Sequence, residues 1–293
     1  MIESYAATLY ASGILDRAAD VLEQRLVANA GSVETLKTLG AIYRKQGRLP
    51  DALTVYKRIA TLAPEDAHAQ FLVSVLSGQL PPVLPPEDGL QPAPFVFIEN
   101  FLPAEFHQTL LPRVLAAPDE DVVPSTVGKD EYNPDRRISF TVGGLKEIQS
   151  QFWDHVAAAL PSLCPRLHVP AFTVGQREVR IRTYRAGNFF DVHRDNSIPE
   201  TADRQVSFVY FFHRVPRRYT GGELLMLDTS ADSLRYSITN FTRIVPTDNA
   251  IVLFPSRFYH AVVPVECPSS DPGDTRFVVN GHIRRKKQTT EAP

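Results

Sequence analysis

Two different periodicities divide this chain of 293 residues. Over the first eighty residues, apolar positions recur every three or four residues, which is typical of amphipathic helices. The same pattern returns after 34 residues, so that Gly13 corresponds to Gly47 and Ala18 to Ala52. This period predicts stacked helical hairpins, in which a small residue such as Gly40 lets two helices approach closely.

The second copy of the repeat, residues 32–66, resembles the tetratricopeptide pattern in its spacing of Leu39, Gly40, Tyr43 and Tyr56. Residues 67–80 predict a further amphipathic helix. We therefore expect an all-helical tetratricopeptide domain over residues 1–80, made of two repeats and a capping helix. Such repeats form a groove that binds peptides or proteins. Because so short an array buries little core, we expect it to pack against the rest of the chain or against a second copy in a homodimer.

The pattern changes after residue 80. Residues 81–94 are rich in proline, which predicts a semi-rigid linker. Apolar spacing then predicts a strand at 95–101 and helices at 103–117 and 145–160. Alternating or continuous apolar runs predict strands at 178–184, 205–212, 223–227, 250–254 and 276–283. The fold class is therefore α+β, with a jelly roll braced by helices over residues 95–285 and a tail at 286–293.

Composition excludes several function classes. The chain carries 31 basic and 33 acidic residues, so no net field favours nucleic acid or an anionic membrane. Two cysteines cannot form a disulfide framework, which favours a reducing compartment, and the first residues do not resemble a signal peptide. We expect a cytoplasmic protein with no nucleic-acid or membrane partner.

The candidate chemistry lies in the second region. His193 and Asp195 are two residues apart in a predicted strand, so their side chains can face one point. His260 follows another apolar run and would complete the set of two histidines and one carboxylate that holds Fe(II). Arg276 opens the last predicted strand, where its guanidinium could grip the carboxylate of an acidic co-substrate.

These residues lie within a set of five segments that occur in order along the chain. The segments are YRAGNFFDVHRDN at 184–196, QVSFVYFF at 205–212, TGGELLML at 220–227, FPSRFYHAVVPV at 254–265 and RFVVNGHI at 276–283. Together they resemble the Fe(II)/2-oxoglutarate dioxygenases of the prolyl 4-hydroxylase type, over about residues 95–285. The chain departs from many relatives at Phe190, where they have tyrosine, and at His282, where they have tryptophan; we expect His282 to be structural.

This resemblance implies a double-stranded β-helix in which His193, Asp195 and His260 bind Fe(II). It implies that Arg276 and Tyr184 bind 2-oxoglutarate, that O2 is the second co-substrate and that ascorbate is a candidate additional cofactor. No other side chain is expected to take part directly in the chemistry.

Substrate-binding residues are expected in two places. Arg180 and Arg182 share the strand parity of Tyr184 and could meet an acidic substrate at the mouth of the site, although a solvated rim is an equal alternative. The long polar segment 118–143 is a candidate lid, with a disordered linker as the competing interpretation. Within it the candidate substrate contacts are Tyr132, Arg136 and Arg137.

The leading hypothesis is an oxidoreductase that hydroxylates an unactivated C–H bond on a peptide or protein side chain, as prolyl hydroxylases do, with the substrate docked on the repeats. A first alternative is a hydroxylase of a free amino acid or small-molecule intermediate, with the repeats used for dimerisation. A second is a catalytically inactive binding protein with the same two modules. A third is a cupin-type metal enzyme that uses no 2-oxo acid.

Overall fold

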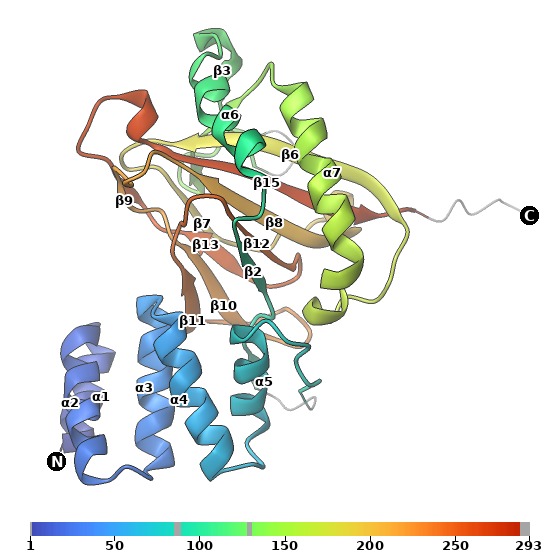
Figure 1. Cartoon of the computed structure of the whole chain (residues 1–293). Helices are drawn as coiled ribbons and strands as arrows, with labels where there is room; N and C mark the ends of the chain where they lie inside the picture. Colours follow the sequence, from blue (N-terminus) through green and yellow to red (C-terminus); the bar gives the residue numbers. More distant parts are fainter. Residues whose placement is uncertain (1, 85–88, 128–130, 288–293) are drawn as a thin grey trace, which may run out of the picture. The chain divides into compact units, whose positions relative to one another are not determined.

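A computed structural model describes residues 2–84, 89–127 and 131–287 (Figure 1). The chain divides into two units, the first formed by residues 1–92 with 226–244 and the second by residues 93–225 with 245–293. The α+β class is confirmed, with a helical region followed by a jelly roll. No helix within the described ranges is both long and apolar enough to cross a membrane.

The first unit contains five helices that pack in chain order, each against the next (Figure 1). They are α1 (Ile2–Ala11), α2 (Leu15–Ala28), α3 (Val33–Gln46), α4 (Leu49–Leu62) and α5 (Ala67–Leu76). Helix α3 begins at Ser32, whose hydroxyl accepts the N–H of Thr35, and ends at Gly47 in a left-handed conformation. A Cβ at Gly40 would lie 2.9 Å from Tyr56, so the close approach expected at this glycine is present.

Two strands distant in sequence belong to this helical unit. Strand β11 (Tyr236–Ile244) pairs with β10 (Leu224–Ser230), which begins in the second unit and continues into the first. The short strand β1 (Leu90–Gln91) pairs with the end of β10. Strand β11 was not expected from the sequence, because polar residues interrupt it and it has no continuous apolar run. The domain bounds 1–80, 81–94 and 95–285 stay a prediction, as does the tail, of which residues 288–293 lie outside the described part.

The second unit is built on two facing antiparallel layers. The larger sheet has the order β2-β12-β8-β15-β6-β5-β3. Its strands are β2 (Val96–Glu99), β3 (Val122–Pro124), β5 (Phe140–Val142), β6 (Val174–Tyr184), β8 (Arg204–Phe212), β12 (Ala250–Pro255) and β15 (Arg276–Arg285). Facing it, β13 (His260–Val262) pairs with β7 (Phe189–His193), and β7 pairs with β4 (Arg137–Ile138). A separate pair joins β9 (Thr220–Gly221) to β14 (Val265–Glu266).

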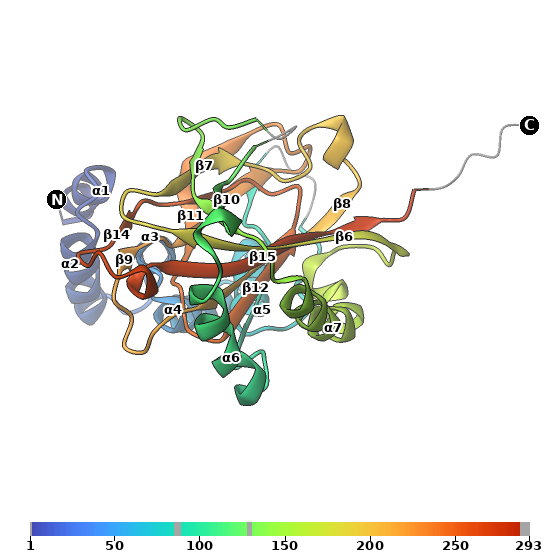
Figure 2. The same ribbon diagram turned by 90° about the horizontal axis from the view of Figure 1, so that it is seen from above.

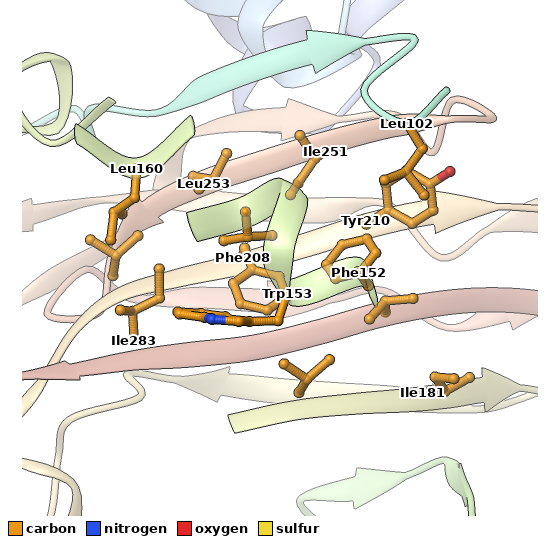
Figure 3. Packing of buried hydrophobic residues seen from close by; sticks show 14 of the residues in the cluster. Leu102, Phe152, Trp153, Leu160, Ile181, Phe208, Tyr210, Ile251, Leu253 and Ile283 are labelled. Atoms are coloured by element: carbon orange, nitrogen blue, oxygen red, sulfur yellow. The ribbon is translucent and has the colours of Figure 1, made fainter. Parts of the chain in front are cut away.

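Helices α6 (Ala104–Leu115) and α7 (Lys146–Leu163) cover the outer face of the larger sheet (Figure 2). Alternate residues of β8 divide the two faces of the sheet, as a period of two requires. Phe208 and Tyr210 point outward and pack with Phe152 and Trp153 of α7 (Figure 3). Ser207, which precedes Phe208 and has the opposite parity, lines a cavity on the inner face. The apolar core therefore supports the sheet from outside and leaves its inner face for polar side chains.

The segment 118–143 has regular structure in its described parts, 118–127 and 131–143. It contains a 3-10 turn (Asp119–Asp121) and the strands β3, β4 and β5. Strand β5 pairs with β6 and β4 with β7, so the segment contributes to both layers. The interpretation as a disordered linker is wrong for these parts, because Val122 pairs with Val142 and Ile138 pairs with Phe189 of β7. A role as a lid stays a prediction.

Candidate metal centre and co-substrate cavity

The two histidines meet across one strand pair. His260 of β13 lies opposite His193 of β7 in the antiparallel register. Asp195 follows two residues after His193, just beyond the end of β7, and its two carboxylate oxygens approach both rings. The distances are 3.5 Å to Nε2 of His193 and 3.4 Å to Nε2 of His260. One ligand atom from each of the three lies within 4.8 Å of the others, so a single ion can contact all three.

Each imidazole is held in the orientation that metal binding needs. Nδ1 of His193 lies 2.7 Å from the carbonyl of Asp191, and Nδ1 of His260 lies 3.1 Å from the carbonyl of Phe258. A carbonyl only accepts, so Nδ1 carries the proton in both rings and donates it, which leaves the Nε2 lone pairs directed at the shared point. Burial lowers the pKa of His260 to about 4, so this ring is neutral at neutral pH.

Asp195 is held by a polar cluster from the larger sheet. The hydroxyl of Ser207 donates to its Oδ2 at 2.6 Å, and the backbone carbonyl of Asp195 accepts from Arg204 at 2.9 Å. Burial alone would raise the pKa of the Asp195 carboxyl, but the rings of His282, His260 and His193 lower it well below its usual range. The carboxylate is therefore ionised, as a metal ligand must be.

His282 takes part in this support. Its Nδ1 lies 3.2 Å from the Ser207 hydroxyl and 3.5 Å from Oδ2 of Asp195. Burial lowers the pKa of His282 to about 4, so it stands beside Asp195 as a neutral ring. We assign it the positioning of Asp195 through Ser207, in keeping with its expected structural role.

Arg276 is a buried cation that forms no ion pair or hydrogen bond with any carboxylate of the described residues. Its side chain is 1% exposed, and within the described part of the chain none of its three guanidinium nitrogens has a hydrogen-bond partner. The guanidinium lies 4.7 Å from the ring centre of Tyr184 and 5.4 Å from that of Phe211. Burial lowers the pKa of Arg276, which reflects the cost of holding this charge without a counterion. An unpartnered buried guanidinium calls for a carboxylate from a ligand.

The backbone leaves room for that guanidinium at one glycine. Gly222 has a φ of +68°, and a Cβ there would lie 2.5 Å from Cδ of Arg276. The segment between His260 and Arg276 is also anchored, because Arg214 forms ion pairs of 2.7 Å with both Asp271 and Asp274. The long connection therefore does not loosen the start of β15.

Tyr184 lies opposite Arg276 in the register of β6 and β15. Its hydroxyl accepts from Nη2 of Arg137 at 3.4 Å. Burial alone would raise the pKa of Tyr184, but the guanidinium groups of Arg137, Arg276 and Arg182 together lower it. The phenol thus lies among cations, in a position to donate its proton to an anionic ligand.

One cavity of about 460 Å³ between the two layers is lined by the three candidate metal ligands and by Ser207, His282, Tyr184 and Arg276. Four of the five candidate substrate residues line it as well, namely Arg136, Arg137, Arg180 and Arg182. Tyr132 is 55% exposed and is absent from the described lining. Sequence reasoning missed Arg194 and Ser207. The sequence does carry a signal for Ser207. It is a polar residue inside the apolar run of β8, and it faces the same side of the strand as Val209, opposite to Phe208.

The residues present fit Fe(II) and 2-oxoglutarate. His193, Asp195 and His260 would hold Fe(II) with two imidazole nitrogens and one carboxylate, the donor set of sites that leave other positions of the metal to a co-substrate. The orphaned guanidinium of Arg276 lies in the same cavity and matches the distal carboxylate of a 2-oxo dicarboxylic acid. The donor set and the buried cation thus point independently to the same pair of cofactors.

Comparison with known proteins agrees with this fit. Residues 179–284 match the model of the 2OG-Fe(II) oxygenase superfamily, and this segment contains all three metal ligands and Arg276. A PKHD-type hydroxylase of uncharacterised activity from Synechocystis is 29% identical over 196 residues, which is 67% of this chain and 64% of that protein. The matched part therefore spans less than two thirds of that relative.

Two solved structures resemble the chain more distantly. A prolyl-4-hydroxylase from Pseudomonas putida is 19% identical, with a TM-score of 0.49 over 67% of this chain and 94% of that one. A prolyl hydroxylase from Trichoplax adhaerens, solved with a hypoxia inducible factor peptide, is 18% identical, with a TM-score of 0.49 over 65% of this chain and 83% of that one.

Proposed function

We propose that this protein is a 2-oxoglutarate-dependent hydroxylase of a peptide or protein side chain, because residues 179–284 match the 2OG-Fe(II) oxygenase model and contain two histidines and one aspartate placed to hold iron. The observation that carries the proposal is the coexistence, in one cavity, of the His193, Asp195 and His260 cluster with the unpartnered guanidinium of Arg276. A metal site alone would leave that buried cation unexplained.

Each residue has a defined task in this proposal. His193, Asp195 and His260 would hold Fe(II), while Arg276 and Tyr184 would bind the distal carboxylate of 2-oxoglutarate. Fe(II) with O2 and the 2-oxo acid supplies the oxidising power to hydroxylate an unactivated C–H bond, with decarboxylation of the co-substrate. The chain itself needs no general base for that bond; its residues bind, orient and shield the reactants.

Phe190 contributes to the shielding. Its ring stacks on His193 with 3.6 Å between centroids, and the guanidinium carbon of Arg137 lies 4.4 Å from the centre of the same Phe190 ring. Relatives of the prolyl 4-hydroxylase type often have tyrosine here, so this chain has an apolar surface where they have a hydroxyl. The phenyl ring fixes the plane of His193 and keeps water from that side of the metal site.

The substrate class is proposed from the helical unit. The 34-residue repeat of the helical unit has the spacing of tetratricopeptide arrays, which bind peptides and proteins. The Synechocystis relative is described as a hydroxylase. A peptide substrate, prolyl or otherwise, that docks on the helices would give both units of the chain a role. The two free cysteines favour a cytoplasmic setting.

The test uses the full chain loaded with Fe(II) and supplied with 2-oxoglutarate, O2 and ascorbate. Proline-containing peptide pools and free amino acids are offered separately, and mass spectrometry detects the gain of one oxygen atom. Hydroxylated peptides with unmodified free amino acids support the proposal. Modification of free amino acids alone would show that the substrate is a free amino acid, and the helices would then serve dimerisation. An Asp195→Ala variant controls for non-enzymatic oxidation. No 2-oxoglutarate consumption with any substrate would favour an inactive binding protein.

Deletion of residues 1–80 is not a suitable alternative test. Arg44 of α3 is the ion-pair partner of the buried Asp228 on β10, at 2.6 Å. Removal of the helices would take away both the counterion of Asp228 and the packing partner of β11, so a loss of activity would not distinguish docking from misfolding.

A further inference from the structure

The cavity has more positive charge than the proposed cofactors use. Seven arginines and three carboxylates line it. Two of the arginines have carboxylate partners, since Arg204 pairs with Glu178 and Arg136 lies 3.6 Å from Asp191. Arg276 would pair with 2-oxoglutarate. The charges of Fe(II) and the 2-oxoglutarate dianion cancel, so their binding leaves the excess of cations unchanged.

Three of the remaining guanidinium groups have no counterion. Arg137, Arg180 and Arg182 form no ion pair with any residue that the structure describes. Their hydrogen bonds go to neutral groups: Arg137 donates to Ser139 and Tyr184, Arg182 to the amide oxygen of Asn280, and Arg180 to the carbonyl of Val179. Neutral acceptors satisfy N–H groups but do not neutralise charge.

The three side chains converge on one space from both layers. Arg180, Arg182 and Tyr184 occupy every second position of β6 and therefore share its inner face. Arg137 comes from β4 in the facing layer. All three line the cavity that contains the metal ligands. Arg180 is exposed at the mouth, Arg182 is half-buried and Arg137 is buried, so the cations lie at increasing depth from mouth to interior.

A solvated rim does not account for this arrangement. Nε of Arg182 is buried without a hydrogen-bond partner, and Arg137 is only 5% exposed. Burial lowers the pKa of Arg182 well below its usual value, and the neighbouring charge of Arg137 lowers it further. Guanidinium groups held together away from water cost free energy unless an anion joins them.

We infer that the substrate carries an oxyanion group, a carboxylate or a phosphate, which Arg137, Arg180 and Arg182 bind beside the metal site. The inference rests on the proposed function and narrows its substrate to an acidic one. A guanidinium binds either oxyanion through paired N–H donors, and three of them at successive depths can guide the anion inward and fix it there. The same chemistry suits an acidic peptide side chain or a free acidic amino acid.

The test measures binding to the full chain, with turnover prevented. Zn(II) replaces Fe(II), 2-oxoglutarate is kept at saturation, and binding is followed by calorimetry. The probes are short peptide pools with a randomised central residue flanked by aspartate, phosphoserine or asparagine, together with free aspartate and glutamate. We expect an acidic probe to bind about tenfold or more tightly than the asparagine pool, and added salt to weaken that preference.

Arg180→Gln and Arg182→Gln should each weaken binding of the acidic probe by about tenfold, and the double variant by more. Arg177→Gln is the matched control, because Arg177 lies on the same strand at the opposite parity, near Trp153 and outside the described lining. It should leave acidic binding unchanged. In every variant, metal-dependent binding of 2-oxoglutarate reports that the fold and the co-substrate site persist.

The outcomes distinguish failure of the acidic-substrate inference from failure of the proposed function. Tighter acidic binding that the cavity variants remove supports the inference, and the preferred probe identifies carboxylate, phosphate or free amino acid as the source. Normal metal-dependent binding of 2-oxoglutarate with no acidic preference, or with variants that change nothing, overturns the inference and leaves the proposed function intact. Absence of metal-dependent 2-oxoglutarate binding in the unmodified chain would overturn the proposed function, and this inference with it.

Discussion

Substitution of Arg44 by alanine is expected to unfold much of the helical unit. Nη2 of Arg44 lies 2.6 Å from Oδ1 of Asp228, Nη1 lies 3.4 Å from Oδ2, and Nε donates to Thr242 at 2.9 Å. The two charged side chains are only 4% and 6% exposed. Burial opposes the charge of Arg44, but the carboxylate of Asp228 outweighs it and raises the pKa of Arg44.

The magnitude follows from what the substitution leaves behind. Arg44→Ala would leave the carboxylate of Asp228 buried without a counterion, which costs about 3–5 kcal/mol. Typical domains are stable by only about 5–15 kcal/mol, so this loss is a large fraction of the total. Replacement of both partners by apolar residues, Arg44→Met with Asp228→Leu, should recover most of the loss, because neither charge then remains buried.

The assay is urea unfolding of the full chain, followed by the circular dichroism of the helices. Arg48→Ala is the control, because Arg48 pairs with Asp51 at 2.7 Å but both side chains are about half exposed, at 44% and 50%. Such a surface pair is worth no more than about 1 kcal/mol. A loss below about 1 kcal/mol for Arg44→Ala, or a double variant no more stable than the single one, would refute the reasoning.

Two further substitutions test the site and the helical unit. Gly222→Ala should raise the KM for 2-oxoglutarate about tenfold or more, because its Cβ would lie 2.5 Å from Arg276. Gly187→Ala shares the positive φ but meets no atom within 4 Å, and should leave that KM unchanged in steady-state assays. Asp66→Ala should cost about 1 kcal/mol at neutral pH, because Asp66 caps α5 at 2.8 Å from the N–H of Ala69 and pairs with Lys37 at 2.7 Å. Burial opposes ionisation of Asp66, but Lys37 and that N–H together lower the pKa of Asp66 below the ordinary 3.8. The contribution of Asp66 to the free energy of unfolding is therefore complete above pH 3.8 and disappears as the pH falls through the folded-state pKa. Denaturant curves at several pH values should show the gap between Asp66→Ala and the unmodified chain closing in acid; a constant gap would contradict this.

Local patterns in the sequence predict much of the second unit. The strands β6, β8, β12 and β15 and the helix α7 correspond to periodic apolar runs, because periods of two and 3.6 reflect which face is buried. The parity argument also places Arg180 and Arg182 beside Tyr184 on one face. Strand β7 ends at His193, before Asp195, so the two ligands meet through the turn and not through the strand alone.

Other features depend on contacts that no local pattern carries. Asp228 and Arg44 are 184 residues apart, and nothing near either residue indicates the other. Polar residues interrupt strand β11, which therefore lacks a continuous apolar run. The support of Asp195 by Ser207 and His282 comes from three different segments. These pairings are determined by the packing of layers, which the sequence of a single element does not record.

The central claim is that iron and 2-oxoglutarate bind together through the three ligands and Arg276. Anaerobic visible absorption of the purified full chain, titrated with Fe(II) and then with 2-oxoglutarate, tests it most directly. The account predicts a charge-transfer band that requires both additions, that is lost in His193→Ala and that needs far more 2-oxoglutarate in Arg276→Gln. Bound iron with no such band in the unmodified chain would contradict the account.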